Sequence, residues 1–405
     1  MRIVQKFGGT SVGSLERIRA TADLIERSVR KGCETAVVVS AMSGETNRLI
    51  GMARKLCENP PARELDALVS TGEQVSAALM AIELHKRGIG AYSYTGMQAG
   101  FFTDSRHSRA RIQRIECKGL LEHLEQGEVP VLTGFQGVDE DGNITTLGRG
   151  GSDTSAVAMA IALEADSCDI YTDVDGVYTA DPRIVPTARK IDRISYEEML
   201  ELASQGAKVL QNRSVELAMR NNMPICLRSS FEDVPGTLVT SEDKTMERAS
   251  ITGVAYNRDE AKITIRGIPD HPGIAGDVFG PIAQADINVD VIVQDVSEDG
   301  TTDITFTVPR GDFGTAMKTL KDVCKKMKAR DVKGDDTVAK VSIIGVGMRS
   351  HSGVARQMFE ALAKESINIQ MITTSEIKIT VVLDEEYVDL AVRALHSAFE
   401  LDAGD

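Results

Sequence analysis

The sequence contains no tryptophan, and aromatic residues make up only 4% of its 405 residues. Binding of single-stranded nucleic acid depends on aromatic rings against which bases stack and on an excess of positive charge. This chain instead carries a formal net charge of −14 at pH 7. The composition therefore argues against a nucleic-acid partner and against an anionic membrane surface.

Cysteine is sparse and shows no pattern, because no pair among the six has C-x-x-C spacing. Neither a zinc site nor a redox motif is indicated, and we expect reduced thiols in a cytoplasmic protein with no metal site built by its own side chains. The chain also lacks the apolar run of about 20 residues that a membrane helix needs. Its start leads directly into a predicted strand, without the pattern of a signal peptide.

Small residues gather at the start of the chain, where Ile3 to Gly13 reads I-V-Q-K-F-G-G-T-S-V-G. The pattern predicts a buried strand ending at Lys6, a glycine loop, and a helix that begins near Leu15 with Ser14 as its N-cap. Such an arrangement commonly holds a phosphate, because backbone N–H groups and the helix dipole face the anion. The stretch matches neither the P-loop nor G-x-G-x-x-G, so an ordinary turn with a surface lysine stays an alternative.

Two further loops carry polar residues that could meet a ligand. Ser40 and Thr46 come just after a predicted strand over 35–40, where open α/β sheets bind ligands, although either hydroxyl could simply cap the next helix. Glu73 lies in the segment S-T-G-E-Q, which interrupts a helical pattern over 65–84. It could bind an ammonium group, or it could be a first-turn acid favoured by the helix dipole.

The segment from Thr145 to Asp153, T-T-L-G-R-G-G-S-D, directly precedes another predicted helix. A flexible loop capped by Ser152 or Asp153 is one interpretation. Arg149 between glycines favours bidentate recognition of a carboxylate or phosphate. The later segment T-D-V-D-G-V-Y-T-A-D-P-R contains the D-x-D-G of a calcium loop but lacks the required later Glu, which excludes an EF-hand.

The C-terminal part of the chain repeats itself at a spacing of about 80 residues. The segment K-I-T-I-R-G from Lys262 corresponds to K-V-S-I-I-G from Lys340, and H-P-G-I-A from His271 to H-S-G-V-A from His351. Each copy predicts a β-α-β-β-α-β ferredoxin-like module. Paired modules of this kind suggest amino-acid sensors, although a purely structural role is an alternative. A strand over 251–256 could complete either module.

The motifs together resemble the monofunctional aspartate kinases, in the order that this family has them. The matching segments are K-F-G-G-T-S-V, S-A-M-S-G-E-T-N, S-T-G-E-Q, T-L-G-R-G-G-S-D, T-D-V-D-G-V-Y-T-A-D-P-R and the repeated C-terminal modules. The resemblance implies an α/β fold: a three-layer α/β/α sandwich around a mainly parallel sheet, followed by two ferredoxin-like ACT domains. We expect a kinase domain over 1–232, a linker over 233–250, and ACT domains over 251–335 and 336–405, the second of which could include the strand 251–256.

The resemblance also implies a reaction, in which ATP and L-aspartate with Mg²⁺ give 4-phospho-L-aspartate and ADP on the route to lysine, threonine, methionine and diaminopimelate. The implied catalytic residues are Lys6, Asp153 and Lys208. The implied nucleotide-binding residues are Lys6, Gly8, Gly9, Thr10, Thr172, Asp173, Tyr178, Arg183, Lys208 and Val209. The implied aspartate-binding residues are Ser40, Thr46, Glu73, Arg149, Ser152 and Asp153.

The ACT pair would bind lysine and threonine as feedback inhibitors and would join copies of the chain into a dimer or tetramer, with which a shorter ACT-only subunit could associate. The implied effector residues of the first module are Asp270, Gly273, Ile274, Ala275, Asn288, Val289, Asp290 and Gln294. Those of the second are Val354, Ala355, Asn368, Ile369, Ser375 and Glu376.

Two other functions stay open at this point. A related kinase could act on glutamate, acetylglutamate, carbamate or a nucleoside monophosphate, although the E-T-N and T-G-E-Q segments and the doubled C-terminal module argue against it. A non-catalytic amino-acid sensor would bind effectors without ATP turnover, and the set of charged residues at positions 6, 149, 153 and 208 makes it the weaker reading. The kinase hypothesis requires Lys6 and Arg149 to converge on one pocket.

Overall fold

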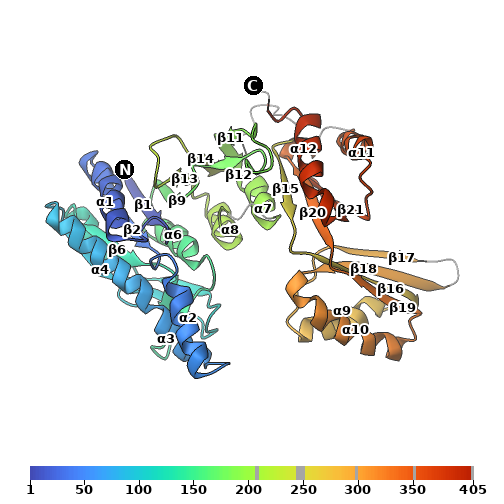
Figure 1. Cartoon of the computed structure of the whole chain (residues 1–405). Coiled ribbons are helices and arrows are strands. Elements are labelled where there is room, and N and C mark those ends of the chain that lie inside the picture. The colour runs from blue at the N-terminus through green and yellow to red at the C-terminus, as the bar shows by residue number, and fades with distance from the viewer. Residues whose placement is uncertain (206–208, 243–250, 297–299, 350–352, 403–405) are drawn as a thin grey trace. The chain divides into compact units, whose positions relative to one another are not determined.

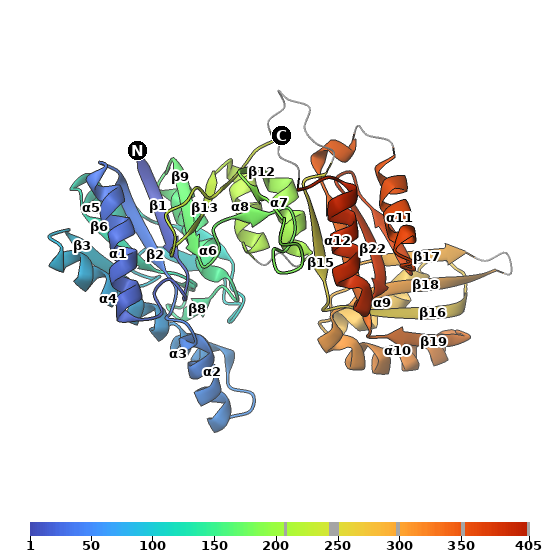
Figure 2. The ribbon, with the colours of Figure 1, turned by 45° about the horizontal axis from the view of Figure 1, so that its top comes forward.

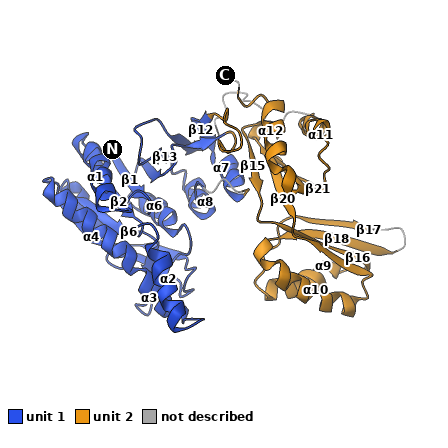
Figure 3. Ribbon diagram, in the orientation of Figure 1, with its two compact units in different colours: residues 1–178, 190–204, 208–246 blue, residues 179–189, 205–207, 247–405 orange. Residues whose placement is uncertain are grey.

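The computed structural model describes residues 1–205, 209–242, 251–296, 300–349 and 353–402. The chain forms two compact units (Figure 3). Unit 1 comprises residues 1–178, 190–204 and 208–246, and unit 2 comprises residues 179–189, 205–207 and 247–405. No helix among the described residues is both long and apolar enough to cross a membrane.

Unit 1 is built on an eight-stranded sheet with the order β12-β14-β13-β9-β1-β2-β6-β3. The strands from β13 to β3 are parallel, whereas β14 runs antiparallel to β13 and β12 runs parallel to β14. The mainly parallel sheet predicted for the N-terminal domain is confirmed. Its strands are β1 (Arg2–Phe7), β2 (Glu34–Val39), β3 (Ala91–Tyr94), β6 (Val129–Thr133), β9 (Ser167–Thr172), β12 (Arg193–Ser195), β13 (Ile225–Ser229) and β14 (Thr237–Thr240).

Helices cover both faces of this sheet (Figures 1 and 2). Phe7 of β1 packs in one hydrophobic cluster with Ile25 of α1 (Leu15–Arg30) and Met80 of α4 (Thr71–Lys86). Neighbouring residues of a strand point to opposite faces, so Lys6 faces the other layer, where Asp153 of α6 (Gly151–Ala162) meets it. The three-layer α/β/α arrangement therefore follows from alternation along β1.

Smaller elements complete unit 1. Helix α1 begins as expected, because Ser14 Oγ accepts a hydrogen bond of 3.2 Å from the Arg17 amide. A four-stranded sheet has the order β5-β4-β7-β8, and β10 pairs with β11. The remaining elements are α2 (Glu45–Leu56), α3 (Ala62–Val69), β4 (Phe101–Thr103), β5 (Ile112–Ile115), α5 (Lys118–Glu125), β7 (Gln136–Val138), β8 (Ile144–Thr146), β10 (Val177–Tyr178), β11 (Lys190–Ile191), α7 (Tyr196–Ser204) and α8 (Asn212–Asn221).

Unit 2 contains two antiparallel sheets with the orders β17-β18-β16-β19 and β15-β20-β22-β21. Two helices pack on each sheet and bury their apolar faces against it, α9 and α10 on the first and α11 and α12 on the second. Both predicted ferredoxin-like modules are confirmed. The elements are β15 (Gly253–Asn257), β16 (Ala261–Pro269), α9 (Ile274–Gln284), β17 (Ile292–Val296), β18 (Thr301–Val308), α10 (Phe313–Met327), β19 (Asp331–Asp335), β20 (Val338–Ile344), α11 (Val354–Lys364), β21 (Met371–Thr374), β22 (Lys378–Asp384) and α12 (Val388–Ala398).

The structure agrees with one alternative that the sequence left open and differs from the expected boundaries in two places. Strand β15 pairs with β20, so it takes the fourth-strand position of the second module, which no strand after α12 fills in the described residues. Strand β14 lies within the expected linker 233–250 but extends the large sheet by pairing with β13. Residues 179–189 fall inside the expected kinase domain, yet Ala180 and Val185 belong to the hydrophobic core of the second module. Strand β15 and residues 179–189 pack against segments far along the chain, whereas β14 pairs with the strand that directly precedes it.

Candidate active site

The neighbouring parallel strands β2, β1, β9 and β13 of unit 1 end at the same edge of the sheet, and the residues that follow them include Gly8, Gly9, Thr10, Ser40 and Asp173. Strands β1 and β9 are neighbours, but the chain connects β1 onward to β2 and β9 onward to β13, in opposite directions across the sheet. Open α/β sheets bind ligands where the strand order diverges in this way. The glycine loop after β1 lies at that point.

Lys6 and Asp153 form an ion pair at this edge. Lys6 Nζ lies 2.6 Å from Asp153 Oδ1, and each side chain is 11% exposed. Asp153 occupies the first turn of α6, where the helix dipole favours a negative charge. An ammonium group has three N–H donors, so Lys6 can contact a second anion while Asp153 holds it in place. The structure thus joins two of the three expected catalytic residues, and the third, Lys208, lies outside the described residues.

The glycine loop places backbone N–H groups beside this ion pair. The Gly8 amide donates to Tyr171 O at 3.1 Å, and a Cβ on Gly8 would lie 3.6 Å from Lys6 Nζ. A Cβ on Gly9 would lie 2.8 Å from Ala41 O, so only glycine fits this approach. Within the described part of the chain, the amides of Gly9 and Thr10 have no hydrogen-bond acceptor. Two unused N–H groups next to a lysine suit the oxygens of a phosphate.

A seryl contact ties the glycine loop to the loops after β9 and β13. Ser11 Oγ donates to Ser230 Oγ at 2.8 Å, and the Ser230 amide donates to Thr172 O at 2.9 Å. Thr172 Oγ1 in turn bonds the exposed Asp173 at 3.1 Å. Two expected nucleotide-binding residues therefore lie at the end of β9, the strand next to β1: Thr172 is its last residue and Asp173 follows it. No pattern in the sequence indicates Ser230, because a single serine after a strand is common.

The other expected nucleotide-binding residues are more scattered. Tyr178 donates to Asp175 Oδ1 at 2.9 Å and is half-buried in unit 1. Arg183 belongs to unit 2, where its exposed guanidinium pairs with Asp181 at 2.7 Å. Val209 is half-buried in unit 1. Contact of these residues with a nucleotide stays a prediction.

Glu73 is a buried carboxylate with one unused oxygen. It lies in the first turn of α4 and is 3% exposed. Its Oε1 accepts a hydrogen bond of 3.2 Å from the Ala41 amide, whereas its Oε2 has no partner among the described residues. Burial raises the pKa of Glu73 to about 7, against the lowering effect of backbone hydrogen bonds. A cationic ligand group at Oε2 would satisfy this oxygen and favour its charge.

The other expected aspartate-binding residues lie after β2, in the segment before α6 and in the first turn of α6. Arg149 is exposed and stands between Gly148 and Gly150, whose φ angles are 84° and 70°. Ser152 is 7% exposed and packs tightly, because a Cβ on Gly134 after β6 would lie 2.6 Å from its Oγ. The Ser40 amide donates to Phe7 O at 3.1 Å. Thr46 is half-buried in the first turn of α2.

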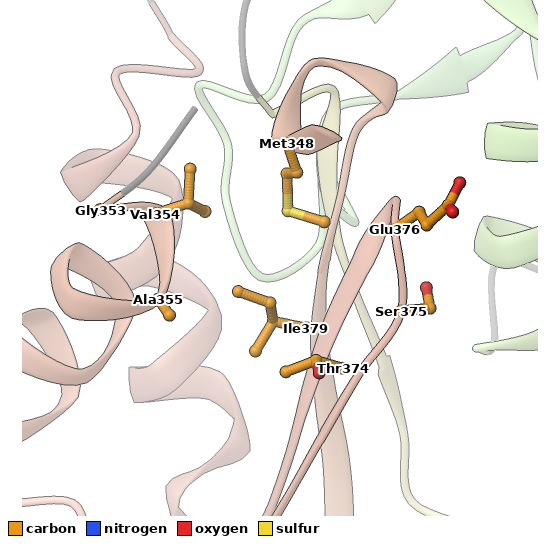
Figure 4. Close-up of a pocket in the computed structure, with 8 residues that line it drawn as sticks. All are labelled: Met348, Gly353, Val354, Ala355, Thr374, Ser375, Glu376 and Ile379. Carbon is orange, nitrogen blue, oxygen red and sulfur yellow. The ribbon is translucent and has the colours of Figure 1, made fainter. Parts of the chain in front are cut away.

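A pocket of about 460 Å³ opens in the second module of unit 2 (Figure 4). The αL residue Gly353, with φ 111°, caps α11 at one side of it, and the β21–β22 turn forms the other side. Four expected effector residues line it: Val354, Ala355, Ser375 and Glu376. Met348 and Ile379 form an apolar wall that no motif in the sequence indicated, and the expected effector residues Asn368 and Ile369 do not line this pocket.

The first module of unit 2 presents a similar helix start. Gly273, with φ 99°, caps α9, Ile274 is buried, and the expected effector residues Asp270, Ala275, Asn288 and Gln294 are exposed while Val289 is half-buried. Asp290 pairs instead with Lys340 of the second module. Lys340 is 2% exposed and also contacts Glu260 Oε1 at 2.6 Å.

Comparison with known proteins identifies relatives for the whole chain. The amino acid kinase family matches residues 1–229, and the ACT domain matches residues 263–325 and 341–399. The aspartokinase of Pseudomonas aeruginosa is 60% identical over 403 residues, which cover 99% of this chain and 98% of the relative. The aspartokinase of Helicobacter pylori is 50% identical over 406 residues, which cover 99% of this chain and 100% of the relative.

Solved structures of an Escherichia coli protein resemble the full chain as well. Aspartokinase III in complex with aspartate and ADP, in its R-state, has a TM-score of 0.83 at 28% identity and covers 98% of this chain and 99% of its own. The same protein in complex with lysine and aspartate, in its T-state, has a TM-score of 0.78 with the same identity and coverage.

Proposed function

This chain belongs to the amino acid kinase family and, within it, to the aspartokinases, and we propose that it phosphorylates aspartate at the edge of the large sheet where β1 and β9 end. The reaction transfers the γ-phosphoryl group of ATP to the β-carboxylate of L-aspartate, giving 4-phospho-L-aspartate and ADP. The observation that carries the site assignment is the ion pair of Lys6 and Asp153 beside two unused amides of the glycine loop.

The residues at the glycine loop are suited to hold the phosphates of ATP. The amides of Gly9 and Thr10 would bind phosphate oxygens, and Lys6 would neutralise charge on the transferred group. No group of three His, Cys, Asp or Glu side chains among the described residues could hold a metal ion. We therefore propose that Mg²⁺ is held chiefly by the nucleotide's own phosphates, as is usual for this ion, and adds positive charge there.

The acceptor side needs two opposite charges at a fixed spacing. We propose that Glu73 pairs with the α-ammonium group of aspartate through Oε2, and that Arg149 binds the α-carboxylate bidentately. The β-carboxylate is already ionised at neutral pH, so no general base is required. Its oxygen attacks the γ-phosphorus, the new P–O bond forms, and the bond to the β–γ bridging oxygen breaks to release ADP. The chain's task is therefore positioning and charge neutralisation.

A direct test measures ADP release with MgATP and a panel of acceptors. Turnover with aspartate, and none with glutamate, acetylglutamate, carbamate or a nucleoside monophosphate, is the expected result. Turnover with another acceptor and not with aspartate would assign the chain to a related kinase. Effector binding without any ATP turnover would favour the sensor reading.

The raised pKa of Glu73 predicts a pH-dependent affinity for aspartate. An ammonium ligand binds the ionised carboxylate, so the KM for aspartate of the wild type is expected to rise roughly tenfold for each pH unit below about 7. The Glu73→Gln variant should have a KM that is high and nearly independent of pH. Initial rates at saturating MgATP between pH 5.5 and pH 8 check this, with the KM for ATP as the internal control.

The raised pKa of Glu73 also predicts how the stability of the protein without substrate depends on pH. The native state keeps the proton of Glu73 up to about pH 7, whereas the unfolded state loses it near its ordinary value of 4.5. Stability therefore falls as the pH rises from 4.5 to 7, by about 3 kcal/mol in all. The Tm of the wild type should drop relative to Glu73→Gln over this window. A constant difference in Tm would contradict the raised pKa.

For regulation, we propose that the two ACT modules bind lysine and threonine as feedback inhibitors of the first step toward the aspartate-derived amino acids. The E. coli relative has been solved with lysine, in a state distinct from its ADP complex. We further propose that the modules join copies of this cytoplasmic enzyme into a dimer or tetramer, with a shorter ACT-only subunit as an additional partner. Mass measurement of the purified protein in solution tests the oligomer.

Filling the pocket of the second module should desensitise the enzyme. Ala355 lines this pocket at the start of α11, and a tryptophan there would occupy space that an amino acid needs. Ala355→Trp is expected to raise the inhibitor concentration for half-inhibition at least tenfold, a coupling of about 1.4 kcal/mol, with turnover in the absence of effector retained. Titration with lysine, threonine and both together checks it. Ala363→Trp, on the exposed side of α11, is the matched control, and equal inhibition of both variants would exclude the pocket.

A further inference from the structure

Asp66 of α3 is a buried carboxylate that joins three separate segments of unit 1. It is 1% exposed. Its Oδ2 accepts from the amides of Ser108 at 2.8 Å and Thr146 at 3.0 Å, and from His107 Nδ1 at 3.1 Å. Its Oδ1 accepts from the hydroxyl groups of Thr146 at 2.6 Å and Ser108 at 3.2 Å. Both carboxylate oxygens are thus fully used inside the protein, which leaves none for a ligand.

The segments that Asp66 joins lead directly to the two residues proposed to hold aspartate. Thr146 is the last residue of β8, and the chain reaches Arg149 three positions later. Helix α3 passes through Ser70 into α4, whose first turn carries Glu73. One carboxylate therefore connects the backbone that precedes the proposed carboxylate clamp with the helices that carry the proposed ammonium partner.

The loop that contains Ser108 supports this connection. Ser108 has a φ of 66°, a left-handed conformation that a non-glycine residue adopts only when its surroundings hold it. Its carbonyl oxygen would lie 3.1 Å from a Cβ on Gly148, the residue before Arg149. Arg213 also holds this region, because its guanidinium donates to Leu147 O at 3.2 Å and to Ala110 O at 2.9 Å.

We propose that Asp66 is a positioning residue that sets the spacing between Glu73 and Arg149, and thereby the fit of a four-carbon amino acid. This inference rests on the proposed roles of those two residues. Displacing one binding group by about 1 Å can reduce kcat/KM about 100-fold, because the substrate must meet all its partners at once. A buried charged group adds little to the free energy of unfolding, because its desolvation offsets its interactions. A buried charge whose hydrogen bonds are all satisfied does, however, determine which segments of the chain pack together.

The Asp66→Asn variant tests this because it keeps the shape of the side chain. The Ser108 amide donates to both carboxylate oxygens, at 2.8 Å to Oδ2 and 3.1 Å to Oδ1. In either orientation the NH₂ group of asparagine therefore faces this amide, which cannot accept a hydrogen bond, and one bond to Ser108 is lost. The KM for aspartate should rise 10- to 100-fold, while kcat and the KM for ATP change less than about threefold. The preference for aspartate over glutamate, as a ratio of kcat/KM, should fall as well.

Asp139→Asn is the matched control. Asp139 is also buried, at 3% exposed, and its Oδ1 accepts from the amides of Asp141 at 3.1 Å and Asn143 at 2.8 Å in the β7–β8 turn. Like Asp66→Asn, this variant removes one buried negative charge that bonds the β7–β8 hairpin, but at the turn, away from the end of β8 that leads to Arg149. A lower Tm with an unchanged KM for aspartate is expected.

The outcomes separate this inference from the function on which it rests. If wild-type protein releases no ADP with aspartate, the proposed function fails. If the wild type is active and Asp66→Asn lowers only the active fraction or kcat, as a structural lesion would, the positioning role is overturned. Should Asp66→Asn not fold, Thr146→Val removes one hydroxyl donor and keeps the backbone bond. It should raise the KM for aspartate three- to tenfold, and an unchanged KM would overturn the proposal.

Discussion

Replacing Lys6 by methionine is expected to lower kcat by about two orders of magnitude or more, with little change in the KM for aspartate. Methionine keeps most of the volume of the side chain but removes the ammonium group beside the glycine loop. That group is proposed to act on the transferred phosphoryl, whose charge changes in the transition state, and not on the acceptor. Steady-state kinetics with saturating MgATP and varied aspartate measure both quantities.

The variant also leaves Asp153 as an unpaired carboxylate that is only 11% exposed, so stability has to be separated from chemistry. Lys6→Met with Asp153→Asn should regain Tm without regaining kcat. Lys31→Met, which changes an exposed lysine after α1, is the control and should behave as the wild type. Turnover of Lys6→Met close to that of the wild type would remove Lys6 from catalysis.

Replacing Arg149 by alanine should raise the KM for aspartate about 100-fold and leave the KM for ATP unchanged. A bidentate pair between a guanidinium and a carboxylate contributes roughly 2–3 kcal/mol, which corresponds to this factor. Arg149→Lys keeps the charge but not the planar pair of donors, so it should recover only part of the affinity. Kinetics with varied aspartate at fixed MgATP, and direct binding of aspartate by calorimetry, provide the measurement.

Arg30→Ala provides the comparison, because Arg30 is an exposed arginine at the end of α1 whose guanidinium pairs with Glu26 on the same helix. It should not alter either KM. An Arg149→Ala variant with an ordinary KM for aspartate would show that the arginine does not bind the acceptor. It would also remove the requirement that Lys6 and Arg149 share a pocket.

Local pattern was sufficient for the parts of the fold that are contiguous in sequence. The first strand, the glycine loop and the helix capped by Ser14 follow from short-range preferences, and the structure has them as expected, except that the strand continues one residue beyond its predicted end at Lys6. The repeat of about 80 residues was equally easy to recognise, because two copies of one module need the same pattern of apolar residues for their cores. The ion pair of Lys6 and Asp153 was within reach only because the family motif places both residues at strand and helix ends.

Contacts between segments that are distant in the sequence could not be predicted from local patterns. Asp66 lies on the inner face of the short helix α3, where the sequence shows only an acid that interrupts an apolar pattern. The fold is needed to show that Asp66 bonds to Thr146, 80 positions later in the chain. From the sequence, Lys340 is expected to be a surface lysine near the start of a strand. In the structure it is buried where the two modules meet, and it pairs with Glu260 and Asp290. The signal for Asp66 was a charged residue at a position where helix periodicity requires an apolar one. Lys340 gave no such signal, because strand alternation places it on the face opposite to Val341 and Ile343.

By itself the sequence determined the family, the reaction and the order of the elements, because these depend on motifs whose residues lie close together in the chain. Only the tertiary structure decided that β15 completes the second module, that β14 extends the large sheet, and that residues 179–189 pack into unit 2. Backbone hydrogen bonds and apolar contacts of this kind are available to any exposed strand edge or core surface. Which strand edge or core surface a segment packs against depends on the packing of the whole folded chain, and no local sequence pattern specifies it.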